Sequence, residues 1–467
     1  MLLLTLTPQN GPDLYYGLDV SGSGNNVALS YDLPTVALET GTLTVTLELT
    51  PDLKTFWQKG NVFGGAVVVA DETRTWWTGF ITQADVNLSD NTISIQSSPI
   101  ALSRKAPTRR LPKHTVLEVV PDLYDEAQDR NQAVPDLFGT CYGVPPVLAS
   151  NPEYESNLIY IVAGHSVETT HASLFTDNLF LGTYPIRHQQ GPFGDYAYIG
   201  VPKTALPNGG GALWIAQVTG RQSNLSDILR QLANDYLPED TQDWMDLQGI
   251  SYADQFLKSF SAGVLFNSEI GNADILTTVG QRFSSSFPVQ VGYPAGKFSW
   301  AYSGVILAPP VEECVTLRYG QDLFSRGALP GMNIDQVSNN FLFTAGFDGG
   351  AGADRAQGTL SHKNSAFCRT SKGRWGESAQ ETINLPDVSD LSTAHLIVEE
   401  RAARSVRVPT QTSYVTTLSD VAKKPLGSFF AIEDEDWFSG KWLMRLDSIS
   451  RVDDGTFSLG VTVFSNT

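Results

Sequence analysis

Cysteine and charge are both scarce in this chain of 467 residues. Its three cysteines, Cys141, Cys314 and Cys368, lie far apart and form no Cys-x-x-Cys pair. An odd number at such spacing argues against a disulfide framework and favours assembly in a reducing cytoplasm. Charged residues make up 17% of the chain, below the usual ~25%. Ser, Thr, Asn and Gln must therefore supply much of the polar surface, which suits β-strands better than helices.

Long apolar runs are also missing. No stretch approaches the ~18 apolar residues of a membrane span, and the N-terminal segment 1–8 carries no cation and too short an apolar run for a signal peptide. Basic residues are outnumbered 31 to 50, which leaves a net charge of −19. Such a chain repels free nucleic acid at long range, which excludes a sequence-reading DNA-binding protein. It could still line a passage through which DNA slides.

Motifs for catalysis are absent from the sequence. There is no His-Glu-x-x-His, no Gly-x-Ser-x-Gly and no phosphate-binding loop ending in Gly-Lys-Ser/Thr. His165 and His171 would share one face of a strand, but no third metal ligand can be named. The Gly-rich segments 22–24 and 348–354 do not lead into a capped helix with a lysine, so they predict no phosphate cradle. We therefore expect no enzymatic activity, no catalytic residue, no cofactor and no bound metal.

Alternation of apolar and polar residues predicts strands near the N-terminus. It is unbroken over 42–50, returns over 92–97 after the turn signal Asp90-Asn91, and two further strands are expected at 67–69 and 76–81. Residues 1–102 are therefore expected to form an antiparallel β-domain.

A basic connector follows this domain, within a stretch 103–220 that is otherwise rich in turn signals and short strands. It is either a solvated linker or a contact with an acidic neighbouring subunit, because a cationic segment is unusual in so acidic a chain. The candidate contact residues are Arg104, Lys105, Arg109, Arg110 and Lys113.

Helical periodicity begins only after residue 220. Apolar positions predict a helix over 225–237, capped by Asn224 or Ser226, and a second over 272–283 that begins at Asn272. With strands at 261–266 and 297–302, residues 221–308 form a small α+β domain. Residues 309–467 are expected to form another β-domain with one helix, from Asp387 or Ser389 to near Pro409. The acidic run 433–436 is a solvated turn, a cation site or a surface that repels DNA.

Two segments of the chain echo each other. The first has Trp76-Trp77-Thr78-Gly79-Phe80 and, after a strand, Asp90-Asn91-Thr92-Ile93-Ser94-Ile95; the second has Trp437-Phe438-Ser439-Gly440-Lys441-Trp442 and then Asp454-Gly455-Thr456-Phe457-Ser458-Leu459. They are either two β-hairpins that look alike by chance or parts of two related β-barrels. In the second case, Trp77 and Phe438 should occupy corresponding positions.

The echo, together with the order β-domain, α+β module, β-domain, resembles tail-tip and baseplate hub proteins of tailed bacteriophages and of gene transfer agents. Residues 136–145 (Asp-Leu-Phe-Gly-Thr-Cys-Tyr-Gly-Val-Pro) resemble a motif of siphophage tail-tip proteins. The resemblance implies a mainly β fold with a smaller α+β part. Residues 1–102 and 309–467 would be two tail-tube-like antiparallel β-barrels, and 103–220 and 221–308 inserted peripheral domains.

The resemblance also implies a function. The chain would be a structural hub, a homotrimeric ring that closes the tail tube and adapts its hexameric symmetry to a threefold tip. Its partners would be tail-tube, distal tail and tip or fibre proteins, with DNA only in transit through the lumen, in a virion assembled in the host cytoplasm. From another class, a carbohydrate-binding or glycan-hydrolysing multidomain β-protein stays open, because nine tryptophans could stack on sugars.

Overall fold

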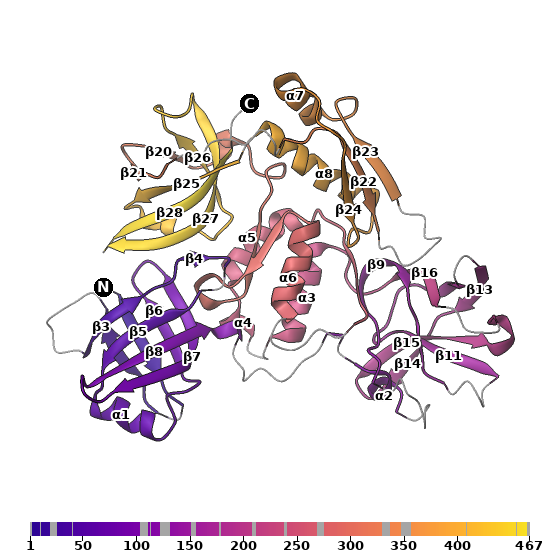
Figure 1. The fold of residues 1–467 in the computed structure, drawn as a ribbon, viewed down its shortest axis with the longest axis horizontal. Helices are drawn as coiled ribbons and strands as arrows, with labels where there is room; N and C mark the ends of the chain where they lie inside the picture. Colours follow the sequence, from indigo (N-terminus) through magenta and orange to yellow (C-terminus); the bar gives the residue numbers. More distant parts are fainter. Residues whose placement is uncertain are drawn as a thin grey trace.

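A computed structural model describes most of the chain (Figure 1). The described residues are 2–9, 11–18, 26–39, 41–102, 111–112, 114–121, 131–150, 156–176, 179–207, 212–237, 241–268, 275–328, 337–346, 356–407, 409–453 and 455–464. Strands dominate and a smaller group of helices lies in the middle of the molecule, so the expected mainly β fold with a smaller α+β part is confirmed. No helix in these ranges is long and apolar enough to cross a bilayer.

The N-terminal part is a closed barrel in the order β1-β2-β3-β5-β8-β7-β6. Its elements are β1 (Leu3–Thr7), β2 (Leu14–Gly17), β3 (Asn26–Asp32), β4 (Val36–Ala37), β5 (Leu43–Glu48), α1 (Pro51–Gln58), β6 (Ala66–Ala70), β7 (Thr75–Asn87), β8 (Thr92–Pro99) and the 3₁₀ turn η1 (Ile100–Leu102). The strands predicted in this part are confirmed. The pairing is not antiparallel throughout, because β2 and β3 run parallel.

The next part packs two sheets against each other, in the orders β10-β11-β15-β14 and β13-β12-β16-β9-β17. The elements are α2 (Val116–Val119), β9 (Asp136–Val144), β10 (Val147–Leu148), β11 (Asn157–Ala163), β12 (His171–Thr176), β13 (Leu179–Pro185), β14 (Arg187–Gly191), β15 (Gly194–Pro202), η2 (Lys203–Ala205) and β16 (Leu213–Thr219). Strand β17 (Gly263–Phe266) reaches this sheet from the α+β part, so the two parts share a sheet.

The α+β part contains both helices predicted for it. Its elements are α3 (Leu225–Tyr236), α4 (Thr241–Trp244), α5 (Leu247–Leu257), α6 (Ile275–Ser286), β18 (Val289–Gly292), η3 (Pro294–Gly296) and β19 (Ser299–Tyr302). Asn224 caps α3 by accepting the N–H of Asp227, as predicted. The expected cap of α6, Asn272, lies outside the described residues. Helix α5 was not predicted.

The last part contains two sheets. Strands β20, β21 and β25 to β28 belong to one, and β22 to β24 form the other. Its elements are η4 (Val311–Glu313), β20 (Thr316–Arg318), β21 (Ser325–Arg326), β22 (Phe341–Ala345), β23 (Ala356–Leu360), α7 (Ala366–Trp375), β24 (Glu381–Leu385), α8 (Leu391–Val406), β25 (Pro409–Thr416), α9 (Ser419–Ala422), β26 (Phe429–Glu433), β27 (Lys441–Asp453) and β28 (Thr456–Phe464). The predicted helix is α8, which Asp390 caps. The expectation of a single helix is wrong, because α7 and α9 are also present.

Two of the hydrophobic cores decide how these parts are joined. One unites the helices α3, α5 and α6 with the segment from β22 to α8, which therefore packs on the α+β part. The other runs from the N-terminal barrel into the sheet of β25 to β28, and includes Val45 and Ile95 as well as Leu459 and Val461. The N-terminal and C-terminal β-units are consequently held together by one continuous core, although most of the chain lies between them in sequence.

Candidate assembly site

Two buried residues, Ala101 and Leu111, anchor the chain before the basic connector and near its end. Its five candidate contact residues, Arg104, Lys105, Arg109, Arg110 and Lys113, lie outside the described residues. Ala101 before it and Leu111 within it are buried in the core of the α+β part, with exposed fractions of 7% and 0%. The contact of the connector with a neighbouring subunit stays a prediction.

The two echoed hairpins share one pairing register around an equivalent bulge, and only the ladder of β27 and β28 slips once more near its turn, between Arg451 and Asp453. Strands β7 and β27 are each 13 residues long and turn back into β8 and β28. Each ladder slips opposite the junction between the fifth and sixth residues of the returning strand, which places a β-bulge at Thr82 in one hairpin and at Asp447 in the other. A bulge adds an unpaired residue and bends the strand at a defined place. Its equivalent position in both hairpins supports a repeat over a chance likeness.

A pair of glycines extends this repeat before the hairpins. Gly64 donates its N–H to the carbonyl of Ile81 at 2.9 Å, and Gly427 donates to that of Leu446 at 2.7 Å. Ile81 and Leu446 are equivalent, since each directly precedes its bulge. Both glycines have left-handed backbone, with φ of 70° and 83°, a conformation that glycine adopts without the steric cost of a Cβ atom.

The flanking strands follow the same register. Strand β6 pairs with the first half of β7 as β26 does with β27, and β5 pairs with β8 as β25 does with β28. Each unit has a helix, α1 or α9, between its first and second strands. The repeat therefore covers four strands and a helix, over 43–99 and 409–464. We call these the first and second β-units.

The aromatic pairs of the echo do not correspond. Trp77 lies inside β7, whereas Phe438 precedes β27, so their predicted equivalence is wrong. Counted from the bulges, the partner of Trp77 is Trp442, because Val69 faces the first and Ile432 the second at equivalent places. The turn before β27 is longer than the turn before β7, which shifted the sequence match.

The two β-units also differ in closure. The first is part of a closed barrel, whereas the second is a curled sheet with β20 and β21 at its two ends. These end strands are joined by a short turn in which Tyr319 and Leu323 form an isolated bridge. The predicted second barrel is therefore a curled sheet spanned by a turn at its open side.

Strand β4 of the N-terminal part joins the C-terminal sheet, which contains the second β-unit. Strand β4 pairs antiparallel with β27, Val36 with Ile449 and Ala37 with Ser448. In Figure 1, β4 lies between the barrel and the C-terminal sheet. The turn before β7 adds two polar links, from Asp71 Oδ2 to Arg451 Nε at 3.3 Å and from Arg74 Nη1 to the carbonyl of Ala422 at 2.9 Å. Backbone, charge and core contacts all fix this junction.

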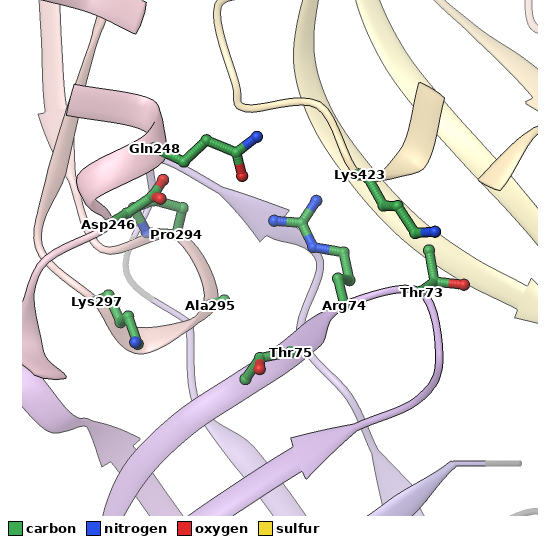
Figure 2. A pocket seen from close by; sticks show the side chains of 9 residues that line it. All are labelled: Thr73, Arg74, Thr75, Asp246, Gln248, Pro294, Ala295, Lys297 and Lys423. Carbon is green, nitrogen blue, oxygen red and sulfur yellow. The ribbon is translucent and has the colours of Figure 1, made fainter. Parts of the chain in front are cut away.

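A cavity of about 440 Å³ opens where three parts of the chain meet (Figure 2). Arg74 extends from the first β-unit toward Gln248 of α5 and Lys423 after α9, and Lys297 lies on the η3 side. Burial lowers the pKa of Arg74 below its ordinary value, while Asp246 acts in the opposite direction. The lining has three cationic side chains and one carboxylate, so it can hold a small anion but is a poor place for a metal cation.

The acidic run is tied into the second β-unit. Glu433 lies 2.8 Å from Arg318 Nε, and Asp434 and Asp436 both contact the guanidinium of Arg326. Arg318 holds the pKa of Glu433 below its usual range. The run is therefore largely an ion-pair network rather than only a solvated turn.

The two histidines considered for a metal site do not share one. His165 is buried, and its Nε2 accepts the N–H of Leu137 at 3.0 Å. His171 is exposed at the start of β12, beside Thr170. Across the described ranges, no three His, Cys, Asp or Glu side chains are grouped as metal ligands.

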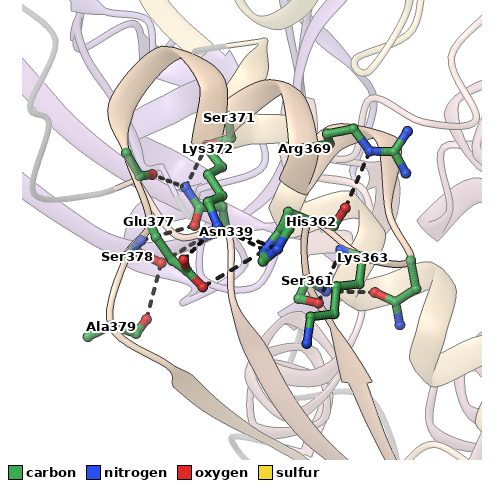
Figure 3. Close-up of polar contacts among 12 residues, drawn as sticks. Asn339, Ser361, His362, Lys363, Arg369, Ser371, Lys372, Glu377, Ser378 and Ala379 are labelled. Atoms are coloured by element: carbon green, nitrogen blue, oxygen red, sulfur yellow. Dashed lines mark hydrogen bonds and ion pairs between the residues drawn. The ribbon is translucent and has the colours of Figure 1, made fainter.

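A polar network of the segment 337–379 has a structural purpose (Figure 3). The buried Asn339 donates to Ser371 Oγ at 3.2 Å and to the carbonyl of Gly376 at 2.8 Å, and accepts the N–H of Ser378 at 3.0 Å. It ties the entry of β22 to the end of α7. Beside it, Lys372 lies 2.7 Å from Glu377 and lowers the pKa of that carboxyl.

The tryptophans do not form an exposed platform. All nine lie in described segments, and each is buried or half-buried. The indoles of Trp76, Trp77 and Trp300 lie in the cores and are at most 1% exposed. The observation that motivated a sugar-binding protein is therefore better explained by packing.

Similarity of this chain to known proteins is found among solved structures. No family model matches the chain, and no curated protein sequence matches it. Among solved structures, it is similar to a tail protein from Neisseria meningitidis MC58, at 8% identity and a TM-score of 0.42, over 100% of this chain and 97% of that one. A 43 kDa tail protein of prophage MuSo2 from Shewanella oneidensis gives 12% identity, a TM-score of 0.39 and coverage of 99% and 98%. A chain of a native gene transfer agent virion gives 10%, 0.46, and coverage of 74% and 86%. The first two of these structures are of tail proteins, and the third is of a virion.

Proposed function

We propose that this chain is a structural subunit of a phage-type tail and forms the hub of its tip. The observation that carries the proposal is the repeat of two β-units with one register, one bulge position and one pair of left-handed glycines. Two equivalent units in one chain give a homotrimer a ring of six such units. Such a ring can contact a hexameric tube on one side and a threefold tip on the other.

The rigid junction supports this role. The two β-units share a core, a strand pairing and a buried ion pair, so each chain would add two units to the ring at a fixed angle. The neighbours in the assembly would be tail-tube or distal tail proteins on one side and fibre or spike proteins on the other. The chain would be located in the virion, at the tail tip, after assembly in the host cytoplasm.

Charge fits passage of DNA through the ring. With a net charge of −19, an acidic lumen wall leaves only weak, screened repulsion beyond a Debye length of about 8 Å. A cationic wall would instead bind phosphates as counterions are released. The connector with Arg109 and Arg110 would then lie away from the lumen, against carboxylates of another chain.

The proposal assigns the chain no catalytic activity. Among the described residues, Arg326 and Asp434 form an ion pair within the second β-unit and its neighbouring strands, and the polar network around Asn339 joins a helix to a strand. We expect no turnover of peptidoglycan, polysaccharide or phosphoester substrates by the purified chain.

Native mass spectrometry combined with imaging of the assembled particle tests the proposal. The expected species has three times the mass of the 50.8 kDa chain and forms a threefold ring. A chain that stays monomeric at micromolar concentration, with no ring in the particle, would overturn it. Tryptophan fluorescence quenched by added saccharide would favour a glycan-binding protein instead.

A further inference from the structure

The internal repeat exposes one difference between the two β-units, at the edge of the long hairpin strand. In the second unit, β26 pairs with β27 only up to Arg445, and beyond it Ser448 and Ile449 pair with β4. The strand is thus covered on that side by a segment that the second unit does not itself supply.

The same edge of the first unit has no such cover. Counted from the bulges, Gln83 and Ala84 are the equivalents of Ser448 and Ile449. Strand β6 pairs with β7 only up to Phe80. Within the described part of the chain, no strand or isolated bridge pairs with residues 83–87 on the side opposite β8.

This edge has the chemistry of a pairing site. An uncovered strand edge presents a row of backbone N–H and C=O groups to any extended segment. The side chains of Gln83, Asp85 and Asn87 are exposed, while Ala84 is buried as Ile449 is. The alternation matches that of the covered edge, so an incoming strand would meet the same two-faced surface.

We propose that the edge 83–87 of β7 receives an extended segment from a second copy of this chain, antiparallel, as β4 is received by β27. The inference rests on the proposed ring and deepens it, because it names the contact between copies. In a ring of six equivalent units, the relation that carries the first β-unit onto the second also carries the second unit onto the first unit of the next copy. A head-to-tail interface of this kind closes into a ring when its rotation closes, as the proposed ring requires.

The same repeat indicates which segment is donated. Strands β3 and β21 are equivalent, because Tyr31 pairs with Val45 as Arg326 pairs with Tyr414. The donor β4 follows β3 directly, so its counterpart is the chain that follows β21, from Gly327 onward. Main-chain hydrogen bonds of an added strand supply affinity without a demanding side-chain match.

Hydrogen–deuterium exchange on the full chain, before and after assembly, tests this contact. We expect exchange in the peptide with residues 83–87 to slow roughly tenfold or more on assembly. The peptide with Ser448 and Ile449 should be protected in both states, because β4 already covers it. An assembled ring in which residues 83–87 exchange as fast as in the monomer overturns this inference and leaves the proposed function standing. A chain that never assembles overturns both.

A photo-cross-linking amino acid at position 85 identifies the donor. We expect an intermolecular product that joins this position to the peptide directly after Gly327 of another copy. Lys54, exposed on α1, is the matched control position and should give no such product. A product that joins position 85 only to its own chain, or to a different protein of the particle, would overturn the assignment.

Discussion

The indole of Trp76, in the first β-unit, stacks on the ring of Phe457 in the second, with centroids 5.8 Å apart and planes inclined by 17°. Both rings are fully buried. Phe457 occupies in its unit the place that Ile93 has in the first. Where the two units touch, the second unit therefore has an aromatic ring in place of an aliphatic side chain. The junction is therefore part of the core of both units.

Replacing Trp76 with alanine should destabilise both β-units together. Loss of a fully buried indole costs about 3–5 kcal/mol when the cavity cannot collapse. Guanidinium unfolding, followed by circular dichroism, should show this loss. Trp57→Ala, at a half-buried indole on α1, should cost less. A loss below about 1 kcal/mol for Trp76→Ala would mean that the shared core is not needed for stability.

The pair of Asp71 and Arg451 gives a double-mutant cycle across the junction. Their side chains are 7% and 6% exposed, so removing one charge takes this ion pair away from the other buried charge. Asp71→Asn and Arg451→Met should each cost about 3–5 kcal/mol, and the double variant clearly less than the sum. Strictly additive losses would show that the two groups do not interact.

Acid should weaken the second β-unit through Glu433. Its pKa is lowered from 4.5 by the hydrogen bond from Arg318, so its contribution to stability is present above pH 4.5 and is lost as pH falls through the lowered pKa. The difference in melting temperature between wild type and Glu433→Gln should shrink across that window. Glu435→Gln, at an exposed carboxylate of the same run, serves as the control. A difference that stays constant with pH would contradict the assignment.

Thiol reactivity should separate the three cysteines. Burial raises the pKa of Cys141 to about 12, and Cys368 is also buried, so neither provides thiolate to a reagent in the folded chain. Cys314 is only partly buried and should react slowly. Titration with a chromogenic disulfide should modify one thiol in the native protein and three in denaturant. Fast modification of Cys141 in the native chain would contradict this packing.

Charge reversal in the connector should slow assembly. Arg109→Glu together with Arg110→Glu places like charges against an acidic neighbour, and rim charges guide docking more than they add affinity. Light scattering should show slower ring formation, more so at low salt, with unchanged melting of the monomer. Assembly of the double variant at the wild-type rate in low salt would exclude the contact.

Local patterns predicted the hairpins and several helices well. The alternation at 92–97 and the repeated Thr-x-Ser fixed both returning strands, and Asn224 marked the start of α3. Helix α1 had signals that were available, since Thr50 accepts the N–H of Leu53 and Pro51 opens the first turn, where its missing N–H costs nothing. Asp246 likewise caps α5. Both helices are short, and each follows a strand or a turn-rich stretch. The helical spacing of their apolar residues is therefore difficult to recognise in the sequence.

Other features had no local signal at all. The pairing of Val36 with Ile449 involves a strand of two residues, too short for any periodicity. The cavity draws Arg74, Lys297 and Lys423 from three distant segments, and each looks like an ordinary surface cation in sequence. Arg326 satisfies the acidic run from far earlier in the chain. These contacts follow from topology, which periodicity does not encode.

Strand β4 also sets an order of events during synthesis. Its two residues are made long before their partners in β27. The loop that this pairing closes is very long, so its closure waits until β27 has been made. A chain that has not yet reached β27 cannot form the junction. Only a chain that already includes β27 can therefore hold both β-units in one fixed arrangement.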